Sequence, residues 1–177
     1  MINKQTGYTL IELIMTVALL VIVLTAGTAI FYRSFQSSGL SDIQATVNND
    51  LNSLSDAIDR NIRFAEVVRV DNNFRTDCLN TPGGKVVGST LVVDDFTGGS
   101  TAYSLSLPDG KVSSTSANPT VLNSPDIQVT KLEFTWYCKS GVNDKINIDI
   151  EAKALTTAAG STGVLNKEIN LLNSGIN

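Results

Sequence analysis

The stretch GYTLIELIMTVALLVIVLTAGTAIFYR, residues 7–33, decides how this chain begins to fold. Between Tyr8 and Tyr32, Glu12 is the only side chain that carries a charge at neutral pH. About twenty apolar residues are enough for a helix to cross the hydrocarbon core of a membrane, and residues 13–32 supply them. A carboxylate held at mid-membrane costs roughly 2.5–3.5 kcal/mol, so the position of Glu12 at the start of this run requires a reason.

The residues around the start of the run form a specific combination. Gly7 precedes an aromatic residue, Tyr8, and Glu12 is the fifth residue counted from Tyr8. In this combination the N-terminus resembles the type IV pilins and the pseudopilins of type II secretion. The resemblance implies a prepilin peptidase that cleaves between Gly7 and Tyr8 and methylates the new amino group of Tyr8. The resemblance is strong over about the first thirty residues, and the rest of the chain resembles these proteins only in outline.

The resemblance also implies a role for Glu12 in assembly. In a filament core its carboxylate can pair with the methylated amine of Tyr8 on a neighbouring subunit, which neutralises both charges and sets the axial register. The alternative is a carboxylate that lies idle at the level of the lipid headgroups. The family's major pilins usually carry a helix-bending proline in the apolar run. Residues 8–34 contain none, which favours a minor pilin or a pseudopilin.

Beyond residue 39 the apolar residues recur at spacings of three and four, which is typical of an amphipathic helix. They are Leu40, Ile43, Val47, Leu51, Leu54, Ile58 and Ile62. We expect this stripe to pack on the chain's own domain. Ser37, Ser38 and Gly39 separate it from the membrane-spanning part, where we expect a continuous helix with a weak point or a short break.

From Glu66 onward the period falls to two, which predicts β-strands. The predicted strands are residues 66–70, 89–94, 102–107, 128–137, 145–154 and 164–171. Residues 113–125 contain two prolines and few apolar side chains, which predicts a surface loop. The short connections favour antiparallel pairing. The expected fold is α+β and pilin-like: a long N-terminal helix, with a membrane half and an amphipathic half, packed on an antiparallel β-sheet.

These patterns divide the chain into four expected regions. Residues 1–7 are the prepilin leader, and residues 8–34 form the transmembrane or filament-core helix. Residues 35–66 form the amphipathic second half of that helix. Residues 67–177 form a β-rich exported globular domain, whose size is close to that of the commonest domains.

The two cysteines, Cys78 and Cys138, both lie in the exported region. In an oxidising compartment we expect them to form a disulfide, and two buried free thiols are the alternative. Closing a loop of about sixty residues stabilises a domain by roughly 4 kcal/mol in the chain-entropy model. The sequence contains no Cys-x-x-Cys, which argues against a redox enzyme.

The composition argues against several other classes of function. The chain contains no histidine, which removes Ser-His-Asp and Cys-His catalysis and the commonest zinc and iron ligand, so we expect neither an enzyme nor a cofactor. The net charge is −4, or −5 if Lys4 leaves with the leader, and it predicts no nucleic-acid site. The acidic residues lack the spacing of a calcium loop, so no metal site is expected. The candidates by residue type are Asp94, Asp95, Asp126, Asp144 and Asp149.

The sequence therefore predicts a structural subunit, a minor pilin or pseudopilin of a type IV pilus or a type II secretion-like filament. Its implied partners are prepilin peptidase, other pilin or pseudopilin subunits and an inner-membrane assembly platform. It is expected in the inner membrane, with its C-terminal domain exported, and then in the filament. Two alternatives stay open: a secreted β-domain binding protein cleaved before Ile30, and an uncut single-pass binding protein or adhesin that begins at Met1.

Overall fold

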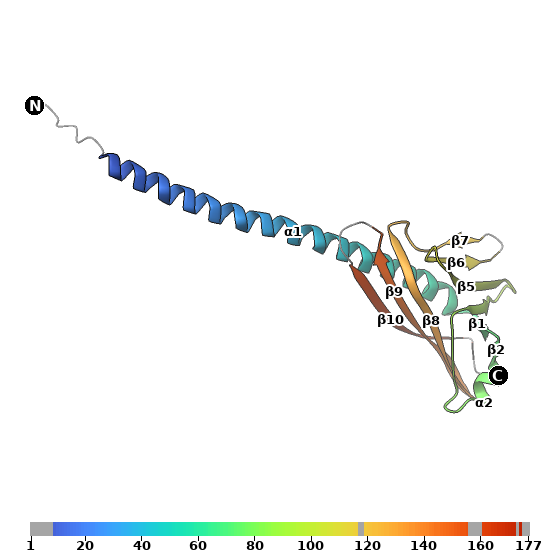
Figure 1. The fold of residues 1–177 in the computed structure, drawn as a ribbon. Coiled ribbons are helices and arrows are strands. Elements are labelled where there is room, and N and C mark those ends of the chain that lie inside the picture. The colour runs from blue at the N-terminus through green and yellow to red at the C-terminus, as the bar shows by residue number, and fades with distance from the viewer. Residues whose placement is uncertain (1–8, 117–118, 156–160, 173, 175–177) are drawn as a thin grey trace, which may run out of the picture. The chain divides into compact units, whose positions relative to one another are not determined.

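The computed structural model describes residues 9–116, 119–155, 161–172 and 174, and within α1 the side chains of Gln36 and Leu40 also stay outside the description (Figure 1). The chain divides into two compact units, Met1–Asp42 and Ile43–Asn177. One long helix followed by two antiparallel sheets makes the fold α+β, as predicted.

The long helix is α1, Leu10–Ile62. Its backbone is helical through Ser37, Ser38 and Gly39, so of the two expected outcomes the continuous helix is the one observed. Further along, the apolar stripe faces the domain core. Its members Val47, Leu51, Leu54, Ile58 and Ile62 are buried and Ile43 is half-buried, whereas the side chain of Leu40 lies outside the description.

The first sheet contains six strands in the order β2-β1-β4-β5-β6-β7, all paired antiparallel. Its strands are β1 (Glu66–Val70), β2 (Asn73–Phe74), β4 (Leu91–Asp94), β5 (Ser100–Ser106), β6 (Lys111–Thr115) and β7 (Thr120–Val121). Only short strands form its edges, and this limits the backbone exposed for pairing with other chains.

The second sheet contains four antiparallel strands in the order β10-β9-β8-β3. Its strands are β3 (Lys85–Gly88), β8 (Ile127–Lys139), β9 (Val142–Ala154) and β10 (Thr162–Asn170). Figure 1 shows β8, β9 and β10 side by side, with β5, β6 and β7 in a separate group. Gly141 adopts a φ of 72° in the turn between β8 and β9, a conformation that glycine reaches without a steric penalty.

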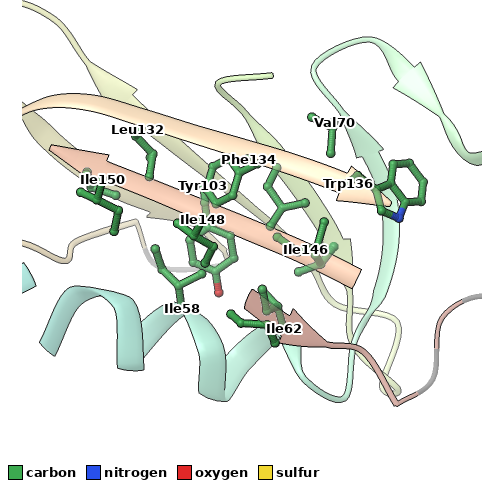
Figure 2. Close-up of a cluster of buried hydrophobic side chains, with 14 of the residues drawn as sticks. Ile58, Ile62, Val70, Tyr103, Leu132, Phe134, Trp136, Ile146, Ile148 and Ile150 are labelled. Atoms are coloured by element: carbon green, nitrogen blue, oxygen red, sulfur yellow. The ribbon is translucent and has the colours of Figure 1, made fainter. Parts of the chain in front are cut away.

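The core of Ile43–Asn177 lies between α1 and the two sheets. Figure 2 shows Ile58 and Ile62 of α1 directed at the strands that carry Tyr103, Ile146 and Ile148, and all five side chains are fully buried. The alternation that predicted the strands explains this arrangement, because alternate residues are buried from Leu132 to Cys138 in β8 and from Asp144 to Ala152 in β9.

Gly163 allows β10 to approach the helix closely. A Cβ atom at this position would lie 2.6 Å from Leu51 Cδ1 and 2.8 Å from Val47 Cγ1, closer than real contacts allow. A side chain here would therefore push the strand away from α1, so the glycine serves packing rather than a turn.

All six predicted strands are present, with ends that shift by a few residues, but the predicted loop at residues 113–125 is wrong. Residues 113–115 belong to β6, and residues 120–121 form β7. Buried Asn123 supports this hairpin: its Oδ1 accepts from the Val112 amide at 2.7 Å, and its Nδ2 donates to the Gly110 carbonyl at 3.2 Å. Backbone and amide hydrogen bonds, rather than apolar alternation, stabilise these strands.

A short helix, α2 (Arg75–Asn80), was also missed, as were β2 and β3. The helix places Cys78 beside β8, where it forms a disulfide with Cys138, with the two Cα atoms 6.0 Å apart. Cys78 is fully buried and Cys138 nearly so. The expected disulfide is therefore present, and it links α2 to the second sheet.

A charged contact joins β10 to α1. Lys167 Nζ lies 2.7 Å from Asp56 Oδ1 and 3.0 Å from Asp59 Oδ2. Partial burial alone would lower the pKa of Lys167, but the hydrogen bonds to the two carboxylates outweigh it and raise this pKa above its ordinary value of 10.5.

This contact gives a pH-dependent prediction. Because the folded-state pKa of Lys167 is raised, its stabilising contribution is complete below pH 10.5 and is lost as the pH rises through the folded-state value. We expect Lys167→Met to lower the free energy of unfolding by about 1 kcal/mol at pH 7, and the difference from wild type to shrink above pH 10.5. Urea unfolding of both proteins at pH 7 and across the alkaline range measures the difference in unfolding free energy and its change with pH.

The control is Lys145→Met on β9, because Lys145 pairs with Glu168 at 2.9 Å on a more exposed surface. Its effect at pH 7 should be below about 0.5 kcal/mol. A difference between wild type and Lys167→Met that stays constant through the alkaline range contradicts the assigned ion pair.

Candidate functional site

The predicted processing residues lie at the start of the chain. Gly7 and Tyr8 fall outside the described residues, whereas Glu12 lies in the first turn of α1. The amides of Glu12 and Leu13 donate to the Thr9 carbonyl at 3.1 and 3.2 Å, so the helix is already formed at Glu12. A carboxylate in the first turn interacts favourably with the positive end of the helix dipole, so this position stabilises the negative charge of Glu12.

From Leu10 to Phe35 the helix carries exposed apolar side chains on every side. The large apolar side chains of this segment are all exposed; they are Leu10, Ile11, Leu13, Ile14, Met15, Val17, Leu19, Leu20, Val21, Ile22, Val23, Leu24, Ile30, Phe31, Tyr32 and Phe35. Among the described helices, α1 is long and apolar enough to cross a membrane, with a window of mean hydropathy 2.6. Such a surface needs lipid or other helices around it, because an exposed apolar area of this extent is unfavourable in water.

Three threonines interrupt the apolar run without leaving a free hydroxyl donor. Thr16 Oγ1 donates to the Leu13 carbonyl at 2.9 Å. Thr25 and Thr28 donate to carbonyls three and four residues earlier, at 2.9–3.1 Å. The hydroxyl protons are therefore satisfied within the helix, as an apolar environment requires. Sequence reasoning passed over this feature, although threonine inside a helical apolar run is a usable signal for it.

Glu12 is in a different situation. Among the described residues, no basic group lies within ion-pair distance of its carboxylate. The next basic residue along the helix is Arg33, about 30 Å away at 1.5 Å per residue. That length matches the thickness of a hydrocarbon core, also about 30 Å. The helix thus carries one carboxylate at one end of a membrane-length apolar surface and a cation at the other.

A family model matches this segment. Residues 2–28 match the prokaryotic N-terminal methylation motif. This is the signature of the type IV pilins and pseudopilins. The match contains Gly7, Tyr8 and Glu12 and most of the apolar run, and the motif implies processing by a prepilin peptidase and assembly with other pilins. No curated protein and no solved structure matches the chain.

The acidic residues considered for calcium do not come together. Asp94 and Asp95 lie at the end of β4, Asp126 precedes β8, and Asp144 and Asp149 lie on β9. Among the described residues, no group of three acidic, histidine or cysteine side chains is arranged to hold a metal ion. Asp95 has another role: its Oδ1 accepts from Thr97 Oγ1 at 2.6 Å and from the amides of Thr97 and Gly99 at 2.8 Å, which fixes the loop before β5.

Asp144 has an unpredicted structural role. It is fully buried, and its Oδ2 accepts from Arg75 Nε at 3.2 Å, Trp136 Nε1 at 3.2 Å and Ser174 Oγ at 2.9 Å. Its amide also donates to the Ser174 carbonyl at 2.9 Å. One carboxylate thus joins α2, β8, β9 and the segment after β10. From the sequence, Asp144 is only a calcium candidate by residue type. The indole N–H of Trp136, which needs an acceptor when buried, is the signal that could have indicated this role.

Proposed function

We propose that this chain is a minor pilin or a pseudopilin, a structural subunit of a type IV pilus or of a type II secretion-like filament. The observation that carries the proposal is Glu12, a carboxylate in the first turn of α1 that lies within the matched motif. It is the one charged side chain of the described residues from Leu10 to Tyr32, a segment with exposed apolar side chains on all sides. Such a helix needs neighbours, and its carboxylate needs a cation.

The proposed cation is the N-methylated amino group of Tyr8 on a neighbouring subunit. Cleavage between Gly7 and Tyr8 would place a positive charge four residues, about one helical turn, before Glu12. A second subunit displaced along the helix axis by about that distance brings its own Glu12 level with this amine. Pairing satisfies both charges within the apolar bundle, and any other register leaves a charge buried without a partner.

The threonines support the same reading. Because the hydroxyl protons of Thr16, Thr25 and Thr28 are donated within the helix, they need no acceptor on a neighbour. This leaves Glu12 as the group that requires a specific partner between Leu10 and Tyr32. Assembly specificity within this segment is therefore proposed to rest on one charge pair and on apolar packing.

In this proposal the chain has four parts with different destinations. Residues 1–7 are removed as a leader. Residues 8–34 lie in the inner membrane before assembly and in the filament core afterwards, and residues 35–66 extend that helix. Residues 67–177 are exported and carry the disulfide between Cys78 and Cys138, a bond that is favoured outside the cytoplasm. An assembly platform in the inner membrane and an associated ATPase supply the driving force.

Intact mass and N-terminal sequencing of the protein from membranes test the proposal. We expect a chain that begins at N-methyl-Tyr8 in cells with prepilin peptidase and at Met1 in cells without it. A Gly7→Leu variant should stay unprocessed in both, because the peptidase accepts only a small residue before the cut. A mature chain that begins at Ile30 supports a secreted binding protein, and one that keeps Met1 in all cells supports a single-pass anchored protein; either result contradicts the pilin-like role.

A further inference from the structure

A small pocket lies where the chain leaves α1 and enters the first sheet. It has a volume of about 130 Å³ and is lined by Phe64, Glu66, Asp94, Asp95 and Phe96. Two phenylalanines and three acidic residues therefore line one surface depression, which lies entirely within the unit Ile43–Asn177.

Both phenylalanines that line the pocket are exposed to solvent. Phe96 is 87% exposed and Phe64 is 54% exposed. Phe96 belongs to the loop that Asp95 holds in shape, so its ring is presented to solvent by a structured turn. A phenylalanine in this position contributes little to the core, and an exposed ring beside a pocket is typical of a contact residue for another molecule.

The carboxylates give the pocket one sign of charge. Glu66 on β1 lies directly opposite Asp94 on β4, and like charges in such positions repel each other. Hydrogen bonds from Thr97 and Gly99 hold the pKa of Asp95 below its usual range, which favours the charged form of this carboxylate. Among the described residues, no lysine or arginine lies within ion-pair distance of these three carboxylates.

Aromatic rings beside carboxylates are complementary to a guanidinium group. A guanidinium stacks on a ring face by cation–π attraction and donates paired hydrogen bonds to a carboxylate, which an ammonium group does less well. A metal ion suits the pocket poorly, because no three carboxylates in the described residues are arranged around one point and two of the walls are hydrocarbon.

We propose that this pocket binds an arginine side chain presented by a partner protein. The ring of Phe96 covers the guanidinium, and Glu66 with Asp94 accepts its hydrogen bonds, which relieves the repulsion between the two carboxylates. The site goes beyond the proposed filament role and does not depend on processing at Gly7 or on Glu12, so either proposal can fail without the other.

The test uses the full-length protein in detergent micelles and two fluorescent peptides. One peptide contains arginine between glycines, and the other has citrulline, a neutral group of nearly the same shape, in the same positions. We expect fluorescence anisotropy to show binding of the arginine peptide and at least tenfold weaker binding of the citrulline peptide. Phe96→Ala and Glu66→Gln should each weaken arginine binding several-fold.

Two controls separate recognition from folding. Phe74→Ala removes an exposed ring elsewhere, and Asp109→Asn removes an exposed carboxylate from another loop, so both should bind like wild type. Glu66→Gln should also raise the melting temperature while it lowers affinity, because it removes the repulsion with Asp94. Loss of binding through unfolding would show the opposite change.

Three results overturn the proposal. The first is equal binding of the arginine and citrulline peptides, and the second is undiminished binding by Phe96→Ala. The third is saturable binding of calcium ions, added as calcium chloride, that displaces the arginine peptide. This result would mean that the acidic residues of the pocket bind a metal ion. Self-association of the purified protein that Phe96→Ala abolishes would instead make a second copy of this chain the occupant.

Discussion

Glu12→Ala is expected to reduce incorporation of the processed subunit into filaments by about tenfold or more, while cleavage and N-methylation continue. In the proposed function, the variant removes the acceptor for the methylated amine of Tyr8 on a neighbouring subunit. A charge pair about 4 Å apart is worth about 4 kcal/mol at intermediate dielectric before desolvation is subtracted. Only about 1.4 kcal/mol of this needs to survive for a tenfold change in an assembly equilibrium.

The measurement compares the mature subunit in sheared filaments with that left in membranes, and intact mass confirms the methylated N-terminus. Thr16→Val is the matched control, because it changes a polar residue one turn further along the same helix. The Thr16 hydroxyl donates within its own helix, so this variant should assemble normally. Normal incorporation of Glu12→Ala would contradict the proposed charge pair. It would support the alternative, in which the carboxylate of Glu12 lies at the level of the lipid headgroups and has no role in assembly.

Asp144→Ala is expected to destabilise the unit Ile43–Asn177 by about 3 to 5 kcal/mol. The substitution leaves the largely buried Arg75 without this carboxylate and leaves the Trp136 indole N–H and the Ser174 hydroxyl without their acceptor. Each abandoned donor carries a desolvation cost in addition to the lost attraction. Because the same carboxylate joins four segments, we expect the loss to loosen the segment after β10 first.

Denaturant unfolding with the disulfide intact measures this effect. Asp149→Ala is the control on the same strand, since Asp149 accepts a hydrogen bond from Asn166 on an exposed face, and its cost should be below about 1 kcal/mol. A double variant, Arg75→Met with Asp144→Leu, should cost less than Asp144→Ala alone, because it removes the guanidinium together with the carboxylate that it contacts. A single-variant loss no larger than that of Asp149→Ala would show that the buried pair contributes little.

Local pattern was enough to predict most of the architecture. The apolar run and its one carboxylate predicted the helix and its exposed surface, and the spacing of Val47, Leu51 and Leu54 predicted the buried face of α1. The alternation around Phe134 and Ile148 predicted the long strands β8 and β9. These predictions succeeded because a membrane-length run, a helical stripe and a strand alternation are each properties of neighbouring residues.

The errors have a common cause. The strands β6 and β7 are rich in serine and threonine, and the side chain of Asn123 supports them through backbone groups. The helix α2 is only six residues long. It is positioned by the disulfide between Cys78 and Cys138 and by the ion pair between Arg75 and Asp144. Neither element has a periodic apolar pattern, so neither could be recognised before its partners were known.

By itself the sequence determined the N-terminal signature, the membrane-length helix and the alternation of the main strands, because these depend on residues close together in the chain. The tertiary structure alone decided that Asp144 is a buried hydrogen-bond acceptor and that Gly163 is a packing position. It also decided that Phe64 and Phe96 line one pocket together with three acidic residues. These features depend on groups up to about a hundred residues apart in the chain, and the free energy of burying or pairing a charge is set only when folding brings its partners together.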